Sequence, residues 1–334
     1  MSFITNIRSV AKYESKILVR SWFFRIFTLL AVVFLGFFNF AMMLMEDNFG
    51  LWFAKSVSSN IPYLNLLLLN TGQAVVAVFL SSEFLKRDKK LDTSEVFYVR
   101  PLSNAEYVVG KIWGNLRVFL FLNLLVLAIV LAFNFMASGV TVDLPAYLIY
   151  FFLISIPTLI FIIGLSIFLM LLLKNQALTF ILLLGYIGLT LFYIQDKFYY
   201  LFDYMVYNLP LFKSTIVGFS NLELILNHRA IYFFAGLGFI FFTIFLFKRL
   251  PNARRSHYPW LFLSFCMFLL MGTAGFRHVR SILREGEMRA LYTSINNKYV
   301  YEPKMAIDYY DISVEQKSCL LYTSPSPRDQ RGSR

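Results

Sequence analysis

Residues 147–173 read YLIYFFLISIPTLIFIIGLSIFLMLLL and contain no charged side chain. A helix that crosses the hydrocarbon core of a bilayer needs about 20 consecutive apolar residues, and this stretch is longer than that. Backbone N–H and C=O groups cannot be left unpaired in lipid, so a single spanning segment adopts a helix. The stretch therefore predicts a transmembrane helix.

Apolar stretches of the same kind lie on both sides of this one. The predicted spans cover residues 23–45, 61–82, 113–136, 147–173, 177–194, 230–248 and 259–276, and the fifth span is the shortest. Together they predict an all-α integral membrane protein with about seven transmembrane helices.

The composition of the whole chain also indicates a membrane protein. Of its 334 residues, 58% are hydrophobic and 15% are charged, whereas soluble proteins average about 45–50% and about 25%. The net charge of +12 could suggest nucleic-acid binding, but the basic residues lie in short segments between the apolar stretches. The positive-inside rule explains that distribution, so we expect no nucleic-acid partner.

Lysine and arginine in the connecting segments predict the orientation of the chain. They are concentrated before the first span, between the second and third spans, and after the sixth span, which places these segments on one side of the membrane. By the positive-inside rule that side is the cytoplasm. The N-terminus is therefore predicted to be cytoplasmic, and after the seventh span the C-terminal segment is predicted to lie outside.

Residues 1–22 predict an amphipathic helix that lies in the cytoplasmic interface. Its apolar residues recur near helical spacing, and its basic residues form a stripe at every fourth position. The apolar set is Phe3, Ile7, Val10, Ile17 and Leu18, and the basic stripe is Arg8, Lys12, Lys16 and Arg20. The helix could fix the topology of the first span, or it could dock a partner.

The cytoplasmic loop between the second and third spans, residues 83–112, reads EFLKRDKKLDTSEVFYVRPLSNAEYVVGKI. Asp92 and Glu95 have the spacing of a capping box, which predicts that a short helix begins there. Pro101 restricts Arg100 to extended conformations, so this helix ends by about residue 99.

A second capping box, formed by Ser103 and Glu106, follows that break. From it a helix can run without interruption through Gly110 and Lys111 into the third span. The loop is thus predicted to be a helix, a sharp break and a second helix. Such an arrangement suits a lever that transmits force from a soluble partner.

At these residues the chain resembles the permease subunits of ABC transporters of the type-2 exporter class. That family has an interfacial N-terminal helix and a cytoplasmic loop with an acidic turn, a Pro-Leu/Ile-Ser segment and a Gly-Lys pair before the third span. The matching positions here are Glu83, Arg87, Asp92, Thr93, Glu95, Pro101, Leu102, Ser103, Glu106, Gly110 and Lys111. The resemblance covers about residues 3–250.

The resemblance implies an ATP-driven exporter of the bacterial cytoplasmic (inner) membrane. In the family the short loop helix, here residues 93–99, is a coupling helix that docks on a separate ABC ATP-binding subunit. The implied docking residues are Glu83, Arg87, Asp92, Thr93, Glu95, Arg100, Pro101, Ser103 and Glu106. The implied partners are that ATPase, a second permease in a homodimer or heterodimer, and membrane lipid. ATP and magnesium would bind to the ATPase, so no cofactor is expected in this chain.

The sequence lacks the motifs of a catalytic centre, so the chain itself is not expected to be an enzyme. It contains no GxxxxGK[ST], and ATP hydrolysis must therefore come from another chain. It also contains neither GxSxG nor HExxH. The histidines His228, His257 and His278 lack the spacing of metal ligands, so no metal site is expected.

Polar side chains in the second span are candidates for a functional role. Asn65, Asn70 and Gln73 need hydrogen-bond partners at membrane depth, and helical spacing places Asn70 and Gln73 on one face. They could pack helices together, or they could line a translocation path. Because the spans hold no cluster of charges, an apolar path for a lipidic or amphiphilic cargo is the hypothesis for transport.

Residues 195–229 are rich in Phe and Tyr and are broken at Pro210. They match the position at which the family carries re-entrant helices between the fifth and sixth spans. Alternatively, aromatic residues such as Tyr199, Tyr200 and Tyr204 could form an interfacial belt.

The C-terminal part is predicted to differ from the rest. Residues 277–318 would begin an extracytoplasmic segment, with the alternation of a strand around residues 305–312, and they somewhat resemble the entry to the β-domain of aminopeptidase N-like proteins. Some large bacterial permeases carry that domain as a fusion. Residues 319–334 look like a non-native tail. The alternative function is thus the membrane anchor of a truncated extracytoplasmic, aminopeptidase-like enzyme.

Overall fold

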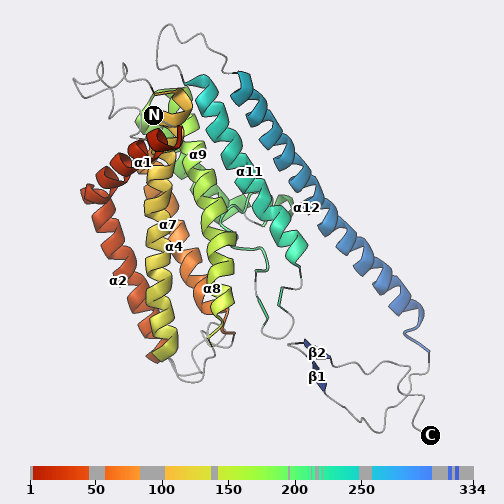
Figure 1. The fold of residues 1–334 in the computed structure, drawn as a ribbon. Coiled ribbons are helices and arrows are strands. Elements are labelled where there is room, and N and C mark those ends of the chain that lie inside the picture. The colour runs from red at the N-terminus through yellow and green to blue at the C-terminus, as the bar shows by residue number, and fades with distance from the viewer. Residues whose placement is uncertain are drawn as a thin grey trace.

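A computed structural model of the protein shows a bundle of long helices (Figure 1). It describes residues 3–44, 57–82, 102–136, 142–194, 196–211, 213–214, 218–219, 221–247, 258–302, 315–317 and 320–322. Within these residues, seven helices are long and apolar enough to cross a membrane. The predicted all-α membrane fold is therefore confirmed.

Successive long helices run in alternating directions through the bundle. The helices are α1 (Phe3–Arg20), α2 (Trp22–Leu44), α4 (Asn60–Ser82), α7 (Asn104–Met136), α8 (Leu144–Tyr150), α9 (Ile156–Leu173), α10 (Gln176–Leu189), α11 (Leu222–Leu246) and α12 (Tyr258–Lys298). The π-helical turn η1 (Phe151–Ser155) joins α8 to α9, η2 (Thr190–Ile194) extends α10, and η3 (Phe198–Tyr200) is a short 3₁₀ turn. Strands β1 (Glu315–Lys317) and β2 (Leu320–Tyr322) form an antiparallel pair.

The beginning of α7 confirms the predicted capping box. The backbone N–H of Ser103 donates to Oε2 of Glu106 at 2.6 Å, and the backbone N–H of Glu106 donates to Oγ of Ser103 at 3.2 Å. The helix then runs for 33 residues without a break. A bilayer core needs only about 20 of these residues, so α7 has turns to spare beyond the hydrocarbon.

Two helices differ from the predicted spans. α11 begins at Leu222, eight residues before the predicted start at residue 230, because the polar side chains of its first turns find partners inside the protein. α12 continues to Lys298 instead of ending near residue 276. Its second half, SILREGEMRALYTSINNK, contains no proline and is rich in helix-forming residues.

The predicted strand around residues 305–312 lies outside the described residues. The described strands instead lie at and just before the expected non-native tail, residues 319–334, because β2 is part of that tail. Residues 277–298 are helix, so the expected change of structure at the end of the seventh span does not occur.

The two ends of the bundle can be told apart by their contacts. Nδ2 of Asn6 in α1 donates to Glu106 of α7 at 2.9 Å, and Nδ2 of Asn104 donates to the carbonyl of Phe247 after α11 at 2.6 Å. α1, the start of α7 and the end of α11 therefore share one end, which we call the α1 end (Figure 1). That the α1 end faces the cytoplasm stays a prediction from the basic residues.

Helices α9 and α11 cross in backbone contact. A Cβ atom added to Gly164 would lie 2.6 Å from the carbonyl oxygen of Gly236, and one added to Gly236 would lie 2.7 Å from the backbone of Ile160. Small residues allow such close approach between membrane helices. The crossing fixes the wall against which the functional site is built.

Candidate functional site

Most of the residues predicted to dock an ATPase lie outside the described part of the chain. These are Glu83, Arg87, Asp92, Thr93, Glu95, Arg100 and Pro101. Ser103 and Glu106 are described, and they begin α7. Glu106 also accepts the hydrogen bond from Asn6, so the cap of α7 is joined to α1.

A buried ion pair clamps α1 to α7. Nζ of Lys111 lies 3.0 Å from Oε1 of Glu14, and the two side chains are 1% and 4% exposed. Removing one partner of such a pair leaves an uncompensated buried charge, which costs about 3–5 kcal/mol. Lys111 of the predicted Gly-Lys pair is therefore committed to a contact inside the protein.

Small residues bring the two helices close enough for this ion pair. A Cβ atom added to Gly110 would lie 2.7 Å from Cβ of Val10, and one added to Gly114 would lie 2.8 Å from the carbonyl oxygen of Ala11. Oγ of Ser15 donates to the carbonyl of Gly114 at 2.6 Å. The contact face of α1 thus combines the small and polar residues Ala11, Glu14 and Ser15 with the apolar residues Val10 and Leu18.

Arg117 completes this clamp. Its Nε donates to Oγ of Ser15 at 2.5 Å and its Nη2 donates to the carbonyl of Ala11 at 2.9 Å. An arginine near a helix end that has no partner extends toward the membrane surface. Because α1 supplies acceptors, Arg117 binds to α1 instead.

The buried face of α1 differs from the predicted apolar face. Val10 and Leu18 are buried as expected, but Phe3 is exposed, and Glu14 lies on the buried side because Lys111 faces it. The basic stripe of Arg8, Lys12, Lys16 and Arg20 is exposed, as predicted. α1 therefore uses its buried face to hold α7, and the basic stripe points away from that contact.

Asn70 and Gln73 join α4 to α7 and η1. Nδ2 of Asn123 in α7 donates to Oε1 of Gln73 at 2.8 Å, and Nδ2 of Asn70 donates to Oδ1 of Asn123 at 3.2 Å. Oγ of Ser155 in η1 donates to the same Oδ1 at 2.8 Å. The predicted shared face of Asn70 and Gln73 is confirmed, whereas Asn123 and Ser155 were not predicted as their partners.

Asn65 joins α4 to α2. Its side chain exchanges hydrogen bonds of 2.7 and 3.1 Å with the side chain of Asn39. Asn65, Asn70 and Gln73 are all fully or almost fully buried. Their contacts match helix packing, one of the two predicted alternatives.

Residues 196–211, which we call the buried loop, form an irregular chain whose central part, residues 203–206, is buried in the bundle. Tyr204, Val206 and Leu211 are completely buried. The hydroxyl of Tyr207 lies 2.9 Å from Oγ1 of Thr71. Because α4 rises about 1.5 Å per residue, Thr71 is roughly 16 Å along it from Asn60. From the end of the bundle opposite the α1 end, the loop therefore reaches well into the interior.

This loop corrects the expectation of re-entrant helices for residues 195–229, and it corrects the expectation of an aromatic belt for Tyr204 but not for Tyr199, which is 45% exposed. In its described part it contains the 3₁₀ turn η3 and other turns, rather than re-entrant helices. Tyr204 stacks on Tyr186 of α10, with ring centroids 5.5 Å apart, and is not part of a surface belt. Aromatic composition alone does not distinguish a surface belt from a packed interior.

Side chains of the surrounding helices satisfy the carbonyl groups of the buried loop. The hydroxyl of Tyr63 donates to the carbonyl of Val206 at 3.2 Å, and the hydroxyl of Tyr232 donates to the carbonyl of Leu201. Non-helical backbone is tolerated at membrane depth only where protein buries it in this way. The surrounding helices therefore supply the hydrogen-bond donors that lipid could not supply.

The start of the loop is a strained left-handed turn. Phe198, Tyr199 and Tyr200 have φ angles of 51°, 59° and 62°, a conformation that costs about 1–2 kcal/mol for each residue other than glycine. Nε2 of His228 lies 3.0 Å from the carbonyl oxygen of Tyr200, and Nε2 of His278 lies 2.9 Å from that of Tyr199. Since a carbonyl can only accept, each Nε2 carries the hydrogen, and the two histidines hold the turn.

Arg229 is the charged group at the centre of the site, and it is 2% exposed. Its Nε donates to the carbonyl of Leu153 at 2.6 Å, and its Nη1 donates to the carbonyl of Tyr204 at 3.0 Å. Its Nη2 donates to Oγ1 of Thr158 at 2.8 Å and, at 3.4 Å, to the carbonyl of Ile154. One guanidinium therefore joins α11, η1, α9 and the buried loop.

Leu153 is available to Arg229 because of a proline. In an α-helix the carbonyl of Leu153 would accept from the N–H of residue 157, but Pro157 has no N–H. The π-helical turn η1 further disturbs the regular pairing at this point. Arg229 therefore donates to a carbonyl that cannot receive the usual α-helical hydrogen bond from residue 157.

The buried loop also contains an acidic side chain near Arg229, Asp203. Asp203 is buried, and it accepts hydrogen bonds from the backbone N–H groups of Tyr207 at 2.9 Å and Asn208 at 2.8 Å. It is close enough to Arg229 to interact with it electrostatically. We did not predict either residue; a charge within the apolar run of residues 222–240 is the signal that could have identified Arg229.

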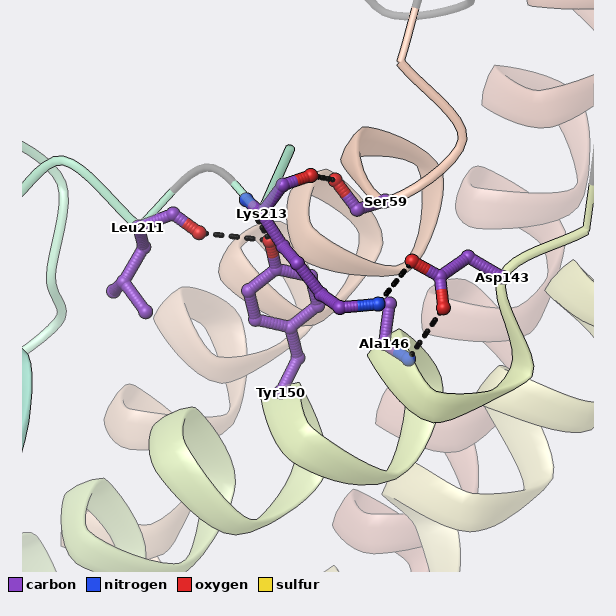
Figure 2. A network of polar contacts seen from close by, with 6 residues as sticks. All are labelled: Ser59, Asp143, Ala146, Tyr150, Leu211 and Lys213. Carbon is purple, nitrogen blue, oxygen red and sulfur yellow. Dashed lines mark hydrogen bonds and ion pairs between the residues drawn. The ribbon is translucent and has the colours of Figure 1, made fainter. Parts of the chain in front are cut away.

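Polar contacts join the chain at the end of the buried loop to α8 and to the start of α4 (Figure 2). Lys213 forms an ion pair with Asp143, which also caps α8 through the N–H of Ala146 at 3.3 Å. The hydroxyl of Tyr150 donates to the carbonyl of Leu211 at 2.7 Å and accepts from the N–H of Lys213 at 3.1 Å. Oγ of Ser59 donates to the carbonyl of Lys213 at 2.7 Å.

Comparisons of the chain with protein-family models, curated protein sequences and solved structures find no match. Among the described residues there is also no group of three or more His, Cys, Asp or Glu side chains that could hold a metal ion. The described site is a set of hydrogen-bonded helices closed around a loop. Its polar side chains hold backbone carbonyl groups of that loop.

Proposed function

We propose that this chain is the transmembrane permease subunit of an ATP-driven ABC exporter. The observation that carries the proposal is the clamp between α1 and the first turns of α7. It makes a rigid extension of a membrane helix at the end that is predicted to be cytoplasmic. The segment directly before α7 contains the residues that resemble an ATPase docking loop.

In this proposal a separate ATP-binding subunit hydrolyses ATP and docks on residues 83–112. Its closure presses on residues 93–99, and the capped, clamped start of α7 moves as one body with α1. Asn123 passes this movement to Gln73 of α4 and to Ser155 of η1, because they share hydrogen bonds. A homodimer or heterodimer of permeases in contact with lipid completes the transporter.

Affinity purification in mild detergent tests the proposal. In one variant residues 92–99 are replaced by Gly and Ser, and in a control Gly and Ser replace the shorter segment 137–141, which follows α7 at its other end. A P-loop ATPase should co-purify with the wild type and the control, and it should be absent with the first variant. If no ATPase accompanies any of the three proteins, the exporter proposal fails.

The second candidate is the membrane anchor of an extracytoplasmic enzyme. The exposed second half of α12 favours it, because that half extends beyond the bundle and carries the chain away from it (Figure 1). Mass measurement of the protein isolated from its native membrane, with a search of its peptides for HExxH, would test this. A zinc motif after α12 would support the anchor without excluding transport.

A further inference from the structure

We propose that the buried loop, residues 196–211, is a gate, and that Arg229 sets its closed state by bonding to carbonyl groups of η1 and of the loop. Which cargo the gate would admit, and what drives it, rest on the proposed exporter function. The gate itself rests on contacts within this chain and can be tested without a partner.

Arg229 is placed to sense whether the gate is closed. Its guanidinium reaches Leu153 on one side and Tyr204 on the other, at 2.6 and 3.0 Å. Thr158 joins the same group, since its Oγ1 accepts from Arg229 and donates to the carbonyl of Tyr204 at 3.2 Å. A shift of the loop away from η1 therefore breaks several bonds to one charged side chain together.

Pro157 makes this closed state specific. Because Pro157 has no N–H, the carbonyl of Leu153 lacks the donor that an α-helix would give it, and Arg229 donates to that carbonyl at 2.6 Å. When the loop and Arg229 move apart from η1, water must replace the guanidinium at that carbonyl. Opening of the gate is thus coupled to hydration of the interior.

Backbone strain in the loop also favours its release from the closed state. Its left-handed turn at residues 198–200 is strained, and its conformation depends on His228 and His278, which hold consecutive carbonyls. Strained segments persist only while their surroundings hold them. Releasing one set of contacts therefore favours release of the rest, as a two-state element requires.

A polar contact connects the gate to α7. Ser155, the last residue of η1, donates to Asn123 of α7 at 2.8 Å. Leu153 and Ile154, which Arg229 contacts, directly precede it. A movement of α7 would change η1, and η1 would change the bonds of Arg229. This last step depends on the proposed function.

Labelling of a cysteine in the loop with a membrane-impermeant maleimide tests the gate. Cys266 and Cys319 are first replaced by Ala and Ser, and Leu209, which is 2% exposed, is replaced by Cys. In intact cells, Arg229→Gln and Pro157→Ala should each raise the labelling rate of the Leu209→Cys variant about tenfold or more, because charge-assisted hydrogen bonds that keep the loop closed are lost or weakened.

Two controls make the result interpretable. Phe202→Cys, a loop position that is 42% exposed, should label equally fast in every background. Pro157→Ala keeps Arg229 and every loop residue and favours the helix, so its effect cannot be ascribed to a lost charge. If Leu209→Cys labels at the wild-type rate in both backgrounds, Arg229 does not hold the gate and the inference is wrong.

A second arm separates the gate from the exporter function. In native membranes, added ATP should raise the labelling of Leu209→Cys in an otherwise unchanged chain. If the Arg229 and Pro157 variants respond but ATP has no effect, the gate stands and the ATP-driven mechanism fails. If ATP has an effect but those variants do not respond, the mechanism stands and Arg229 is not the latch.

Discussion

Single side chains in this protein have roles that depend on which helix faces them. Gly110 and Lys111 lie next to each other in the sequence, and each serves the same contact with α1: the glycine by absence of a side chain, the lysine by charge. The sequence shows the pair but not its partner, because Glu14 is about a hundred residues away. Helical spacing predicts which residues share one face of a helix. It does not predict which residues of other helices that face contacts.

Lys111→Met should destabilise the protein by about 3–5 kcal/mol, because it leaves the carboxylate of Glu14 buried without a partner. Lys12→Met, on the exposed stripe of α1, is the matched control and should change stability little. Thermal unfolding in detergent measures both. Adding Glu14→Gln to Lys111→Met should restore most of the loss; a double variant as unstable as the single one would contradict the clamp.

Asn123→Leu should cost about 1–3 kcal/mol, because it leaves the amides of Asn70 and Gln73 without their shared partner. A double-mutant cycle with Gln73→Leu measures the coupling. The double variant should lose less than the sum of the two single variants, since the same hydrogen bond is removed in each. Strict additivity would mean that the two side chains act independently.

Whole elements were easier to predict than contacts. The apolar runs placed the first five spans to within a few residues, except that α7 starts earlier, at Asn104, as its capping box indicated. The end of α12 was missed because an apolar window reports where lipid ends and not where a helix ends. The start of α11 was predicted too late because a charged residue such as Arg229 usually marks the end of a membrane span. Its buried partners become visible only in the folded protein.

The crossing of α9 and α11 leads to a prediction for those elements. Gly236→Ala should destabilise the bundle by about 1–3 kcal/mol, because its Cβ would meet backbone atoms of Ile160 and Phe161 that cannot move aside. Gly272→Ala in α12 has nothing within 4 Å and should be neutral or stabilising by up to about 1 kcal/mol, since alanine favours helix. Unfolding titrations in detergent compare the two, and equal effects would refute the close crossing.

At the scale of the whole molecule, the sequence predicted a multi-pass bundle, and the structure confirms it. It did not predict the buried loop, because residues from α4, α8, α9, α11 and α12 are needed to enclose it. Each contributes a hydroxyl, an imidazole or a guanidinium that looks like an isolated polar residue in its own segment. Only the assembled bundle shows that Tyr63, Tyr150, Arg229, Tyr232 and His278 serve one stretch of backbone.

The proposed transport mechanism makes a prediction for the complete transporter. Glu95→Lys or Pro101→Ala should leave membrane insertion intact and permit ATP hydrolysis, while export decreases, because force no longer reaches α7. Glu302→Lys, at an exposed position after α12, is the charge-reversal control and should export normally. Export and ATP hydrolysis are measured together in reconstituted vesicles. Transport at the wild-type rate in both variants would count against the lever.

The enclosure of the buried loop also constrains how the protein is made. The chain emerges from the ribosome in order, so the loop is synthesised before α11 and α12, whose side chains hold the carbonyls of Tyr204, Tyr200 and Tyr199. Until those two helices insert, that stretch of backbone has to wait in water or with a membrane insertase. Of the helices in the described part of the chain, α12 is synthesised last, and its His278 completes the contacts that hold the loop.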